Sequence, residues 1–421
     1  MKFNQFNLDS RLEEGIKRAG FDEPTPVQKQ VIPLAMSGHD LIGTAQTGTG
    51  KTAAFVLPIL HKLLQDHQKC LSVLIVTPTR ELAEQINQNI DTLKYGTGLR
   101  NATVYGGVAA NSQIKALRRG VDIVVACPGR LLDLINQECA KLNKVDVLVL
   151  DEADRMLDMG FLPDIKRIIS HLPKQRQTML FSATFAPEIE ALAKQVLHKP
   201  KRIALGISRP AHTVSHALFP VPQHLKAKLL LKVLEHTDTN SVLVFTRTKY
   251  RAKSLARKIE KNNYTVTSLH SNRTQSQRQA ALKGFKEGTY HIMVATDIAA
   301  RGLDVENISH VINFDIPNTP DDYIHRIGRT GRAERSGDAF TFIVPDDEPM
   351  IKKLEKIIGA KIKRKQMEDF DYAAPKAKHN TPSRRENSQT RKYNQRSRPS
   401  GDKKFSGRSK RRTWSKRDKN A

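Results

Sequence analysis

The sequence predicts an α/β protein built from two parallel sheets. Short apolar runs alternate with segments of helical periodicity through roughly the first 360 residues. Several runs, such as residues 145–150, are nearly continuous in apolar side chains, which is typical of strands covered on both faces. Strands that alternate with helices form right-handed β-α-β units, and such units give a parallel sheet. The alternation occurs in two series, which agrees with the two or three domains that 421 residues favour.

The two series have similar elements. In the first, the expected strands are residues 71–77, 102–105, 121–126, 145–150 and 178–182, and the expected helices include residues 80–92 and 187–197. In the second, the expected strands are residues 241–246, 265–269, 291–296, 310–314 and 339–344, and the expected helices include residues 226–236, 249–262 and 275–286. The stretch 199–211 is rich in helix breakers and basic residues and predicts a linker. We therefore assign residues 1–206 to a first domain, 207–213 to the linker and 214–362 to a second domain.

The composition changes sharply near residue 361. From there to the end the chain has 21 Lys and Arg against 6 Asp and Glu, a net charge of +15. Few apolar groups are present, so this segment cannot offset the entropy of folding. Residues 363–421 therefore predict a disordered basic tail. Its interspersed aromatic residues, Tyr393, Phe405 and Trp414, suit sequence-tolerant RNA binding, and a solubilising or partner-binding segment is the alternative.

The net charge of +27 favours a polyanionic partner, either nucleic acid or an acidic membrane surface. No apolar stretch approaches the ~20 residues that span a bilayer, and the N-terminus has no signal-peptide core. The three cysteines, Cys70, Cys127 and Cys139, lack metal-ligand spacing and cannot all pair. This cysteine usage predicts a reducing compartment, the cytoplasm.

A glycine-rich turn, Ala45-Gln46-Thr47-Gly48-Thr49-Gly50-Lys51-Thr52, follows a short apolar run and leads into a helix. Consecutive backbone N–H groups of such a turn close around phosphate oxygens at the positive end of the helix. Lys51 supplies a charge for the outer phosphates, and the Thr52 hydroxyl can hold Mg²⁺. A turn that binds nothing is the alternative, but it does not explain Gly-Lys-Thr between a strand and a helix. The segment predicts a nucleoside triphosphate site.

Two adjacent carboxylates follow the expected strand 145–150 directly, in the sequence Asp151-Glu152-Ala153-Asp154. Ligands of parallel sheets bind at the carboxyl ends of the strands. Asp151 is expected to hold Mg²⁺, directly or through water, and Glu152 to orient and deprotonate the attacking water. A solvated acidic turn is the alternative, and the Lys51-Thr52 pair in the same series argues against it.

The second series has no phosphate loop, but it has arginines at three-residue spacing, Arg326, Arg329 and Arg332, with glycines between them. Planar guanidinium groups match phosphate oxygens in pairs and stabilise the charge that grows during phosphoryl transfer. An exposed basic turn or a nucleic-acid patch is the alternative. If Arg329 and Arg332 complete the first site across a cleft, hydrolysis requires the two halves to close.

These motifs together resemble the DEAD-box family of ATP-dependent RNA helicases over nearly everything before the tail. About ten motifs stand in the family's order, which is highly specific. In the first half they are Phe3 with residues 20–28, then residues 45–52, 78–82, 106–107, 127–130, 151–154 and 182–184. In the second half they are residues 244–247, 275–278, 295–297 with 301–304, and 325–332. The tail and the short loops resemble the bacterial RhlE-like branch.

The resemblance implies two tandem RecA-like domains, with ATP and Mg²⁺ bound between them and single-stranded RNA lying across both. Glu152 is then the catalytic base and Arg329 and Arg332 are arginine fingers. The other implied nucleotide contacts are Gln28 with the adenine edge, Phe3 or Phe21 with the base, Thr47, Gly48, Thr49, Gly50, Lys51 and Thr52 with the phosphates and the metal, and Asp304 with the ribose. Phe3 and Phe21 have an alternative as ordinary core phenylalanines.

Three further residues are implied to connect the site with the rest of the molecule. His325 links the second domain to the acidic motif and its water network. Ser182 and Thr184 couple hydrolysis to strand separation, with ordinary strand-end caps as the alternative. For the RNA backbone, the candidate contacts are Arg80, Gly107, Arg130, Thr246, Arg278 and Thr296.

Two positions depart from the family pattern. Cys127 stands where threonine is usual, which puts a hydroxyl contact to a phosphate in doubt. Ser271 stands where glycine is common, so the backbone before Gln275 is uncertain.

The expected function is an ATP-dependent RNA helicase that melts short RNA duplexes locally or remodels RNA–protein complexes, in ribosome assembly or RNA turnover. A DNA-directed enzyme is one alternative, and the Gln28 and Asp-Glu-Ala-Asp motifs argue against it. An RNA-binding scaffold that hydrolyses little ATP is the other. It has no need of Lys51, Glu152 and both arginines. No membrane partner is expected.

Overall fold

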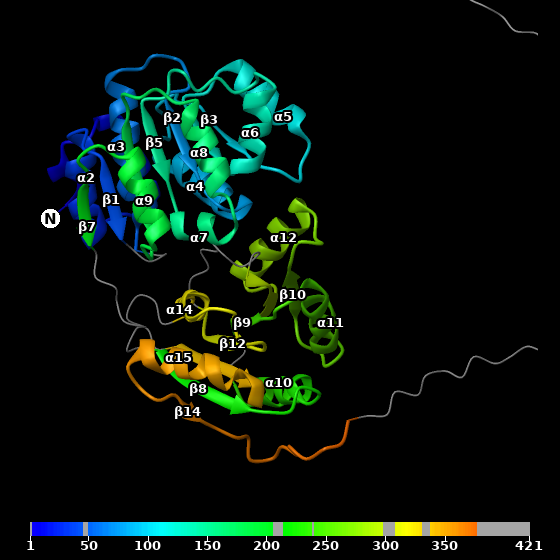
Figure 1. The fold of residues 1–421 in the computed structure, drawn as a ribbon. Helices are drawn as coiled ribbons and strands as arrows, with labels where there is room; N and C mark the ends of the chain where they lie inside the picture. The colour runs from blue at the N-terminus through cyan, green and yellow to red at the C-terminus, as the bar shows by residue number, and fades with distance from the viewer. Residues whose placement is uncertain are drawn as a thin grey trace, which may run out of the picture. The chain divides into compact units, whose positions relative to one another are not determined.

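The computed structural model describes residues 2–44, 49–204, 214–237, 240–297, 308–330 and 337–376. It contains two seven-stranded sheets in which every described strand pair is parallel (Figure 1). The α/β prediction is confirmed. The predicted linker 207–213 lies outside the described residues, as does the chain from residue 377 onward.

The first sheet has the strand order β3-β4-β2-β5-β6-β1-β7. Its strands are β1 (Leu41–Thr44), β2 (Val73–Val76), β3 (Asn101–Val104), β4 (Ile123–Ala126), β5 (Val147–Leu150), β6 (Gln177–Ser182) and β7 (Lys201–Ala204). The helices of this half are α1 (Glu13–Arg18), α2 (Pro26–Met36), α3 (Lys51–Gln65), α4 (Arg80–Leu93), α5 (Ala110–Arg119), α6 (Pro128–Asn136), α7 (Ala153–Asp158), α8 (Leu162–Ser170) and α9 (Pro187–Val196).

Alternate strand residues build two separate cores. Val147 and Val149 of β5 pack with α2, α3 and α4, whereas Leu148 and Leu150 pack with α6, α8 and α9. Because successive side chains of a strand point to opposite faces, an unbroken apolar run is what a doubly covered strand requires. This explains why the buried strands could be predicted from apolar runs.

The second sheet repeats the order of the first, as β10-β11-β9-β12-β13-β8-β14. Its strands are β8 (Val214–Pro220), β9 (Val242–Phe245), β10 (Val266–Leu269), β11 (Ile292–Ala295), β12 (His310–Asn313), β13 (Gly337–Ile343) and β14 (Lys363–Arg364). Its described helices are α10 (Lys226–Glu235), α11 (Lys249–Glu260), α12 (Gln275–Lys286), α14 (Pro320–Ile327) and α15 (Glu348–Ile358). We call the two halves the first and the second lobe.

Threonine hydroxyls fix where many of the helices start. The N-cap hydroxyl accepts a backbone N–H bond from the first turn of α2, α4, α11, α12 and α14, at Thr25, Thr79, Thr248, Thr274 and Thr319. Each cap satisfies one of the N–H groups that a helix start leaves without an intrahelical partner.

One predicted boundary is corrected. Strand β7 lies in the breaker-rich stretch 199–211 but within the assigned first domain, residues 1–206, and it pairs with β1. The tail does not begin at residue 363, because β14 pairs with β8 and the first compact unit of the chain ends at Ala374. Met367, Phe370, Tyr372 and Ala374 pack against the core around α10, and the rings of Phe370 and Tyr372 are 4.8 Å apart. These apolar side chains keep the segment on the second lobe.

Candidate nucleotide and RNA site

The nucleotide motifs of the first lobe meet at the carboxyl edge of its sheet. Strands β5, β6 and β1 are neighbours and parallel, so the segments that follow them gather at one edge. Gly50 has φ 87° and is the N-cap of α3, a left-handed conformation that glycine adopts without strain. Lys51 is the first residue of α3 and is buried. Thr47 and Gly48 lie outside the described residues.

Helix α2 braces this phosphate loop. The Oε1 atom of Gln28 accepts a bond from the backbone N–H of Thr25 (2.9 Å), and its Nε2 atom donates to the carbonyl of Gly50 (3.2 Å). The Thr25 hydroxyl donates to the carbonyl of Thr49 (3.0 Å). A Cβ atom at Gly50 would lie 2.7 Å from Gln28 Nε2. The sequence assigned Gln28 to adenine; the structure adds this link between α2 and the loop, which sequence reasoning missed.

The two predicted base-packing phenylalanines form a stacked pair. The rings of Phe3 and Phe21 are 5.9 Å apart and inclined by 16°. Phe3 is buried and belongs to the core of the first lobe, whereas Phe21 is only partly buried and packs against that core. Phe21 is therefore the more accessible of the two rings.

The two carboxylates that follow β5 differ from ordinary surface carboxylates, Asp151 in its pKa and Glu152 in its backbone conformation. Burial raises the pKa of Asp151 to about 6, although the nearby Lys51 ammonium opposes the rise. Glu152 has φ 53° and ψ 54°, and its backbone N–H donates to Asp151 Oδ1 (3.0 Å). A glutamate in the left-handed region is strained, and such strain clusters at functional sites.

The Glu152 carboxylate has an oxygen that suits a reacting water. Its Oε2 atom is buried and accepts no hydrogen bond from any described residue. The same atom lies 3.7 Å from Arg155 Nε, in an ion pair. A buried acceptor without a hydrogen bond is costly, so a group that donates to it on ligand binding is favoured.

Asp154, the last carboxylate of the motif, holds the segment that follows β6 through hydrogen bonds. Its Oδ2 atom accepts bonds from the backbone N–H groups of Ala183 (3.0 Å) and Thr184 (2.9 Å) and from the Thr184 hydroxyl (3.3 Å). Ser182 Oγ accepts from the backbone N–H of Asp154 (3.1 Å) and donates to the carbonyl of Thr184 (2.6 Å). The acidic motif and the predicted coupling segment therefore form one hydrogen-bonded unit.

In the second lobe, the arginines of the predicted finger segment differ in their surroundings. Arg326 is buried and forms a two-bond pair with Asp297 (2.6 and 2.7 Å). It also donates to Asn313 Oδ1 (3.0 Å) and to the carbonyl of Asp315 (2.7 Å). Arg326 thus fixes α14 to the sheet through partners that belong to its own lobe.

Two side chains near Arg326 share a pocket with Arg155, the residue that follows the acidic motif. Arg155 of the first lobe lines one small pocket together with His325 and Arg329. Burial and the Arg155 guanidinium together lower the pKa of His325 to about 3, and the Asp154 carboxylate opposes this change. Arg329 is buried, and its Nε atom donates to the carbonyl of His325 (3.2 Å). Arg332 and Asp304 lie outside the described residues.

In the second lobe, a lysine side chain is bound at the position that corresponds to the phosphate loop of the first lobe. The segment from β8 to α10 has the place in the second sheet that β1 and α3 have in the first. Lys226 begins α10 as Lys51 begins α3, but its Nζ atom donates to the carbonyls of Phe314 (3.2 Å) and Phe342 (3.0 Å). Because backbone carbonyls already hold this ammonium group, the second lobe has no phosphate cradle there.

Three of the predicted RNA contacts gather around one turn of the first lobe. Gly107 has φ 79°, and a Cβ atom there would lie 2.0 Å from Arg80 Nη1. Arg130 donates twice to the carbonyl of Val108 (both 3.2 Å). Only glycine permits Arg80 to approach this turn so closely.

The predicted RNA contacts of the second lobe are less open. Arg278 is paired with Glu81 of the first lobe (2.9 Å), and the Gln275 amide donates to the same carboxylate (3.4 Å). Thr246 is fully buried, whereas Thr296 is half-buried. The contact between Glu81 and helix α12 was not predicted from the sequence. Gln275 and Arg278 are spaced i, i+3, so they lie on the same face of the helix and can reach one carboxylate. This spacing was the available signal.

Within the described part of the chain, no helix is long and apolar enough to cross a bilayer. Over the same residues, no group of three or more His, Cys, Asp and Glu side chains is arranged to hold a metal ion.

A strand-to-helix phosphate loop, two carboxylates at the end of another strand of the same sheet and an arginine from a second sheet define a nucleoside triphosphatase with two tandem α/β domains. Residues 25–192 match the DEAD/DEAH box helicase family, and residues 225–334 match the helicase conserved C-terminal domain. The ATP-dependent RNA helicase CshA of Listeria monocytogenes is 42% identical over 374 residues, which are 88% of this chain and 72% of that protein. The DEAD-box ATP-dependent RNA helicase CshA of Bacillus subtilis is 40% identical over 372 residues, 88% of this chain and 75% of that protein.

Solved structures agree with this result. S. cerevisiae Dbp5 bound to RNA and ADP BeF3 matches with a TM-score of 0.78 and 28% identity, over 87% of this chain and 95% of that one. Mss116p bound to ssRNA and AMP-PNP matches with a TM-score of 0.78 and 30% identity, over 87% and 79%. The chain belongs to the DEAD-box family of ATP-dependent RNA helicases. The tandem RecA-like fold and the helicase function are confirmed, and the RhlE-like branch stays a prediction.

Proposed function

We propose that this helicase hydrolyses ATP in the space between the phosphate loop of the first lobe and the arginine segment of the second. The observation that carries the proposal is the meeting of Arg155, His325 and Arg329 in one pocket beside the acidic motif. The phosphate loop would hold the triphosphate through Thr47, Gly48, Thr49, Gly50 and Lys51. Gln28 would read adenine, Phe21 would pack on the base, and Asp304 would contact the ribose.

The residues present fit Mg²⁺ bound together with the phosphates. Mg²⁺ is usually held by one or two protein oxygens and completed by water and phosphate. Thr52 and Asp151 offer one hydroxyl and one buried carboxylate, the latter with the raised pKa that a nearby cation would reverse. When bound, the ion neutralises charge on the phosphate oxygens.

Each remaining polar group has one proposed task in hydrolysis. Glu152 takes the proton of the attacking water at its Oε2 atom, which accepts no hydrogen bond from the described residues. Arg329 and Arg332 stabilise the charge that develops on the transferred phosphoryl group. His325 connects α14 to the acidic motif, and its low pKa keeps the ring neutral beside Arg155.

Coupling to RNA is proposed to run through Asp154. This carboxylate holds Ser182 and Thr184 at the end of β6, so a shift of the acidic motif on hydrolysis reaches that segment directly. Arg80, Gly107, Arg130, Thr246, Arg278 and Thr296 are the proposed backbone contacts of single-stranded RNA. Bending of the strand between the lobes would expel a paired neighbour and melt a short duplex locally.

Substrate choice tests the proposal directly. We expect single-stranded RNA to stimulate ATP hydrolysis strongly, and DNA of the same sequence to stimulate it weakly, because 2′-hydroxyl contacts distinguish the two. The measurement is the steady-state rate at saturating ATP against the concentration of each oligonucleotide. Equal stimulation by both would support the DNA-directed alternative, and no stimulation by either would support the scaffold.

The basic tail is proposed to add sequence-independent RNA affinity. Truncation after Lys376 is expected to weaken RNA binding and to flatten its dependence on salt, because fewer counterions are released. ATP hydrolysis at saturating RNA should persist. Affinities measured at several salt concentrations decide this, and an unchanged slope would identify a solubilising or partner-binding segment. The cut belongs after residue 376, because residues 363–374 pack on the second lobe.

The cellular role is proposed to be ribosome assembly or RNA turnover in the cytoplasm. Net charge, the basic tail and family membership support an RNA substrate. Cys70, Cys127 and Cys139 are free thiols, which suits a reducing compartment.

A further inference from the structure

The first lobe has a cavity at the edge of its sheet opposite to the nucleotide motifs. Its walls are the segments that precede β2, β4 and β5, namely residues 70–71, 117–121 and 137–144. These three strands are neighbours and parallel, so their amino ends meet at one edge. Asp151 and Glu152 follow the carboxyl end of β5. The cavity, of about 570 Å³, is therefore separate from the site of hydrolysis.

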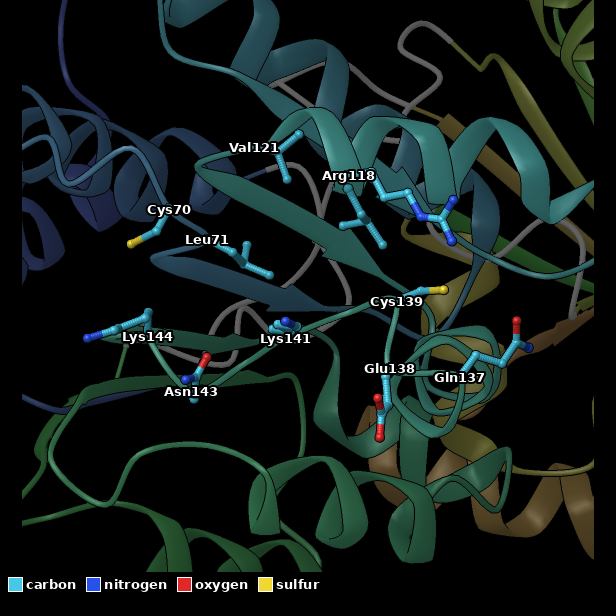
Figure 2. Close-up of a pocket in the computed structure, with 12 residues that line it drawn as sticks. Cys70, Leu71, Arg118, Val121, Gln137, Glu138, Cys139, Lys141, Asn143 and Lys144 are labelled. Atoms are coloured by element: carbon cyan, nitrogen blue, oxygen red, sulfur yellow. The ribbon is translucent and has the colours of Figure 1, made fainter. Parts of the chain in front are cut away.

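The lining combines an apolar floor with a cationic rim (Figure 2). Leu71, Leu117 and Val121 form the apolar part and pack against the core under the sheet. Arg118, Lys141 and Lys144 are exposed cations. Over the described residues none of the three forms an ion pair, and Glu138 is the single carboxylate in the lining. The rim is thus a net positive surface whose charges are not neutralised by neighbours.

The arrangement of these groups selects among anionic ligands. No aromatic side chain lines the cavity, so it lacks the stacking surface that sequence-tolerant single-stranded RNA sites combine with a basic groove. Arg118 and Lys144 lie well apart across the close-up and come from different segments, so they do not converge on one phosphate. An extended chain with several carboxylates can reach both.

We propose that this cavity is a docking site for a short acidic peptide segment of a partner protein. One apolar side chain of the segment enters between Leu71 and Val121, and flanking Asp or Glu residues pair with Arg118 and Lys144. Gln137 and Asn143 add two amide groups to the lining, and such groups can bond a peptide backbone. Because the cavity is at the amino edge of the sheet, a helicase can be tethered there while it binds ATP and RNA.

Selection from a display library of random dodecapeptides on the full chain tests the proposal. We expect enrichment of peptides that combine several acidic residues with one large apolar residue. A synthetic peptide of the enriched sequence should bind the Arg118→Glu, Lys144→Glu double variant roughly tenfold or more weakly than the unchanged chain. The matched control reverses two exposed lysines elsewhere on the same lobe, Lys166→Glu with Lys194→Glu, and should bind normally. RNA-stimulated ATP hydrolysis at the level of the unchanged chain shows that each variant is folded.

The cavity contains its own reporters of occupancy. Cys70 and Cys139 are half-buried in its lining, whereas Cys127 is buried and burial raises its pKa to about 12. The peptide should slow maleimide labelling of Cys70 and Cys139, read by mass spectrometry. Absence of acidic-apolar enrichment, equal binding by the double variant, or labelling that the peptide leaves unchanged would each overturn the proposal. Protection by an RNA oligonucleotide in place of the peptide would also overturn it, because the cavity would then be an RNA surface.

Discussion

Glu152→Gln is expected to bind ATP and RNA with near-normal affinity and to turn over very slowly. The amide has the size and shape of the carboxylate but cannot accept the proton of the attacking water. Loss of a general base typically costs about 10²–10⁴-fold in rate. The measurement is single-turnover hydrolysis at saturating RNA, together with nucleotide and RNA binding by fluorescence anisotropy.

The control for this variant is Glu188→Gln, which makes the same chemical change at an exposed position in the first turn of α9. It should leave turnover unchanged. Near-normal hydrolysis by Glu152→Gln would remove Glu152 from the role of base. Loss of ATP binding in that variant would instead mean that the charge next to Arg155 maintains the site, because Glu152 and Arg155 form a buried ion pair.

Most of the predicted strands are buried and appear in the sequence as apolar runs. Strand β8 is an exception: it lies inside the second sheet but was not predicted, and its first half contains Ser215 and His216. Strand β5 is buried on both faces and reads as an unbroken apolar run. Strand β7 begins Lys201-Arg202 after a proline and lies at the end of the first sheet, so it has no such run. Strand β14 has two exposed residues at the end of the second sheet and depends on the packing of the segment that follows it. An end position alone is not the reason, because β3 and β10 are end strands too and were predicted, with half or more of their residues buried. Strands β7 and β14 depend on tertiary contacts that no local pattern encodes.

The candidate site divides in a similar way. The phosphate loop and the carboxylates could be predicted because each is one short segment whose residue types alone indicate its chemistry. The links between motifs are not local: Gln28 bonds to Gly50, Asp154 to Thr184, and Glu81 to Arg278. Such pairs depend on how the fold brings distant segments together. The sequence predicted Gln28, Gly50, Thr184 and Arg278 as site residues, but neither these pairings nor the role of Glu81.

Arg329→Ala is expected to lower the rate of ATP hydrolysis by roughly 10³-fold, at the lower end of the range for an arginine finger, because Arg332 remains. Nucleotide and RNA affinity should change little, since the guanidinium acts on charge that develops only during phosphoryl transfer. Steady-state rates at saturating ATP and RNA measure the effect. Near-normal turnover would exclude Arg329 as a finger and leave Arg332 as the candidate in this segment.

Arg326, three residues earlier on the chain, is the natural comparison. Its guanidinium is buried and bonded to Asp297, Asn313 and Asp315. Removing one member of a buried pair costs about 3–5 kcal/mol, so Arg326→Ala should lower the free energy of unfolding of the second lobe. We expect a smaller effect from Arg329→Ala, because the described bond of Arg329 is to the carbonyl of His325 in its own segment, whereas the bonds of Arg326 join α14 to the sheet. Thermal unfolding of both variants therefore separates a group that acts on the transferred phosphate from a group that holds α14 in place. If both variants unfold equally early, the loss of hydrolysis in Arg329→Ala reflects a damaged lobe, and the finger assignment fails.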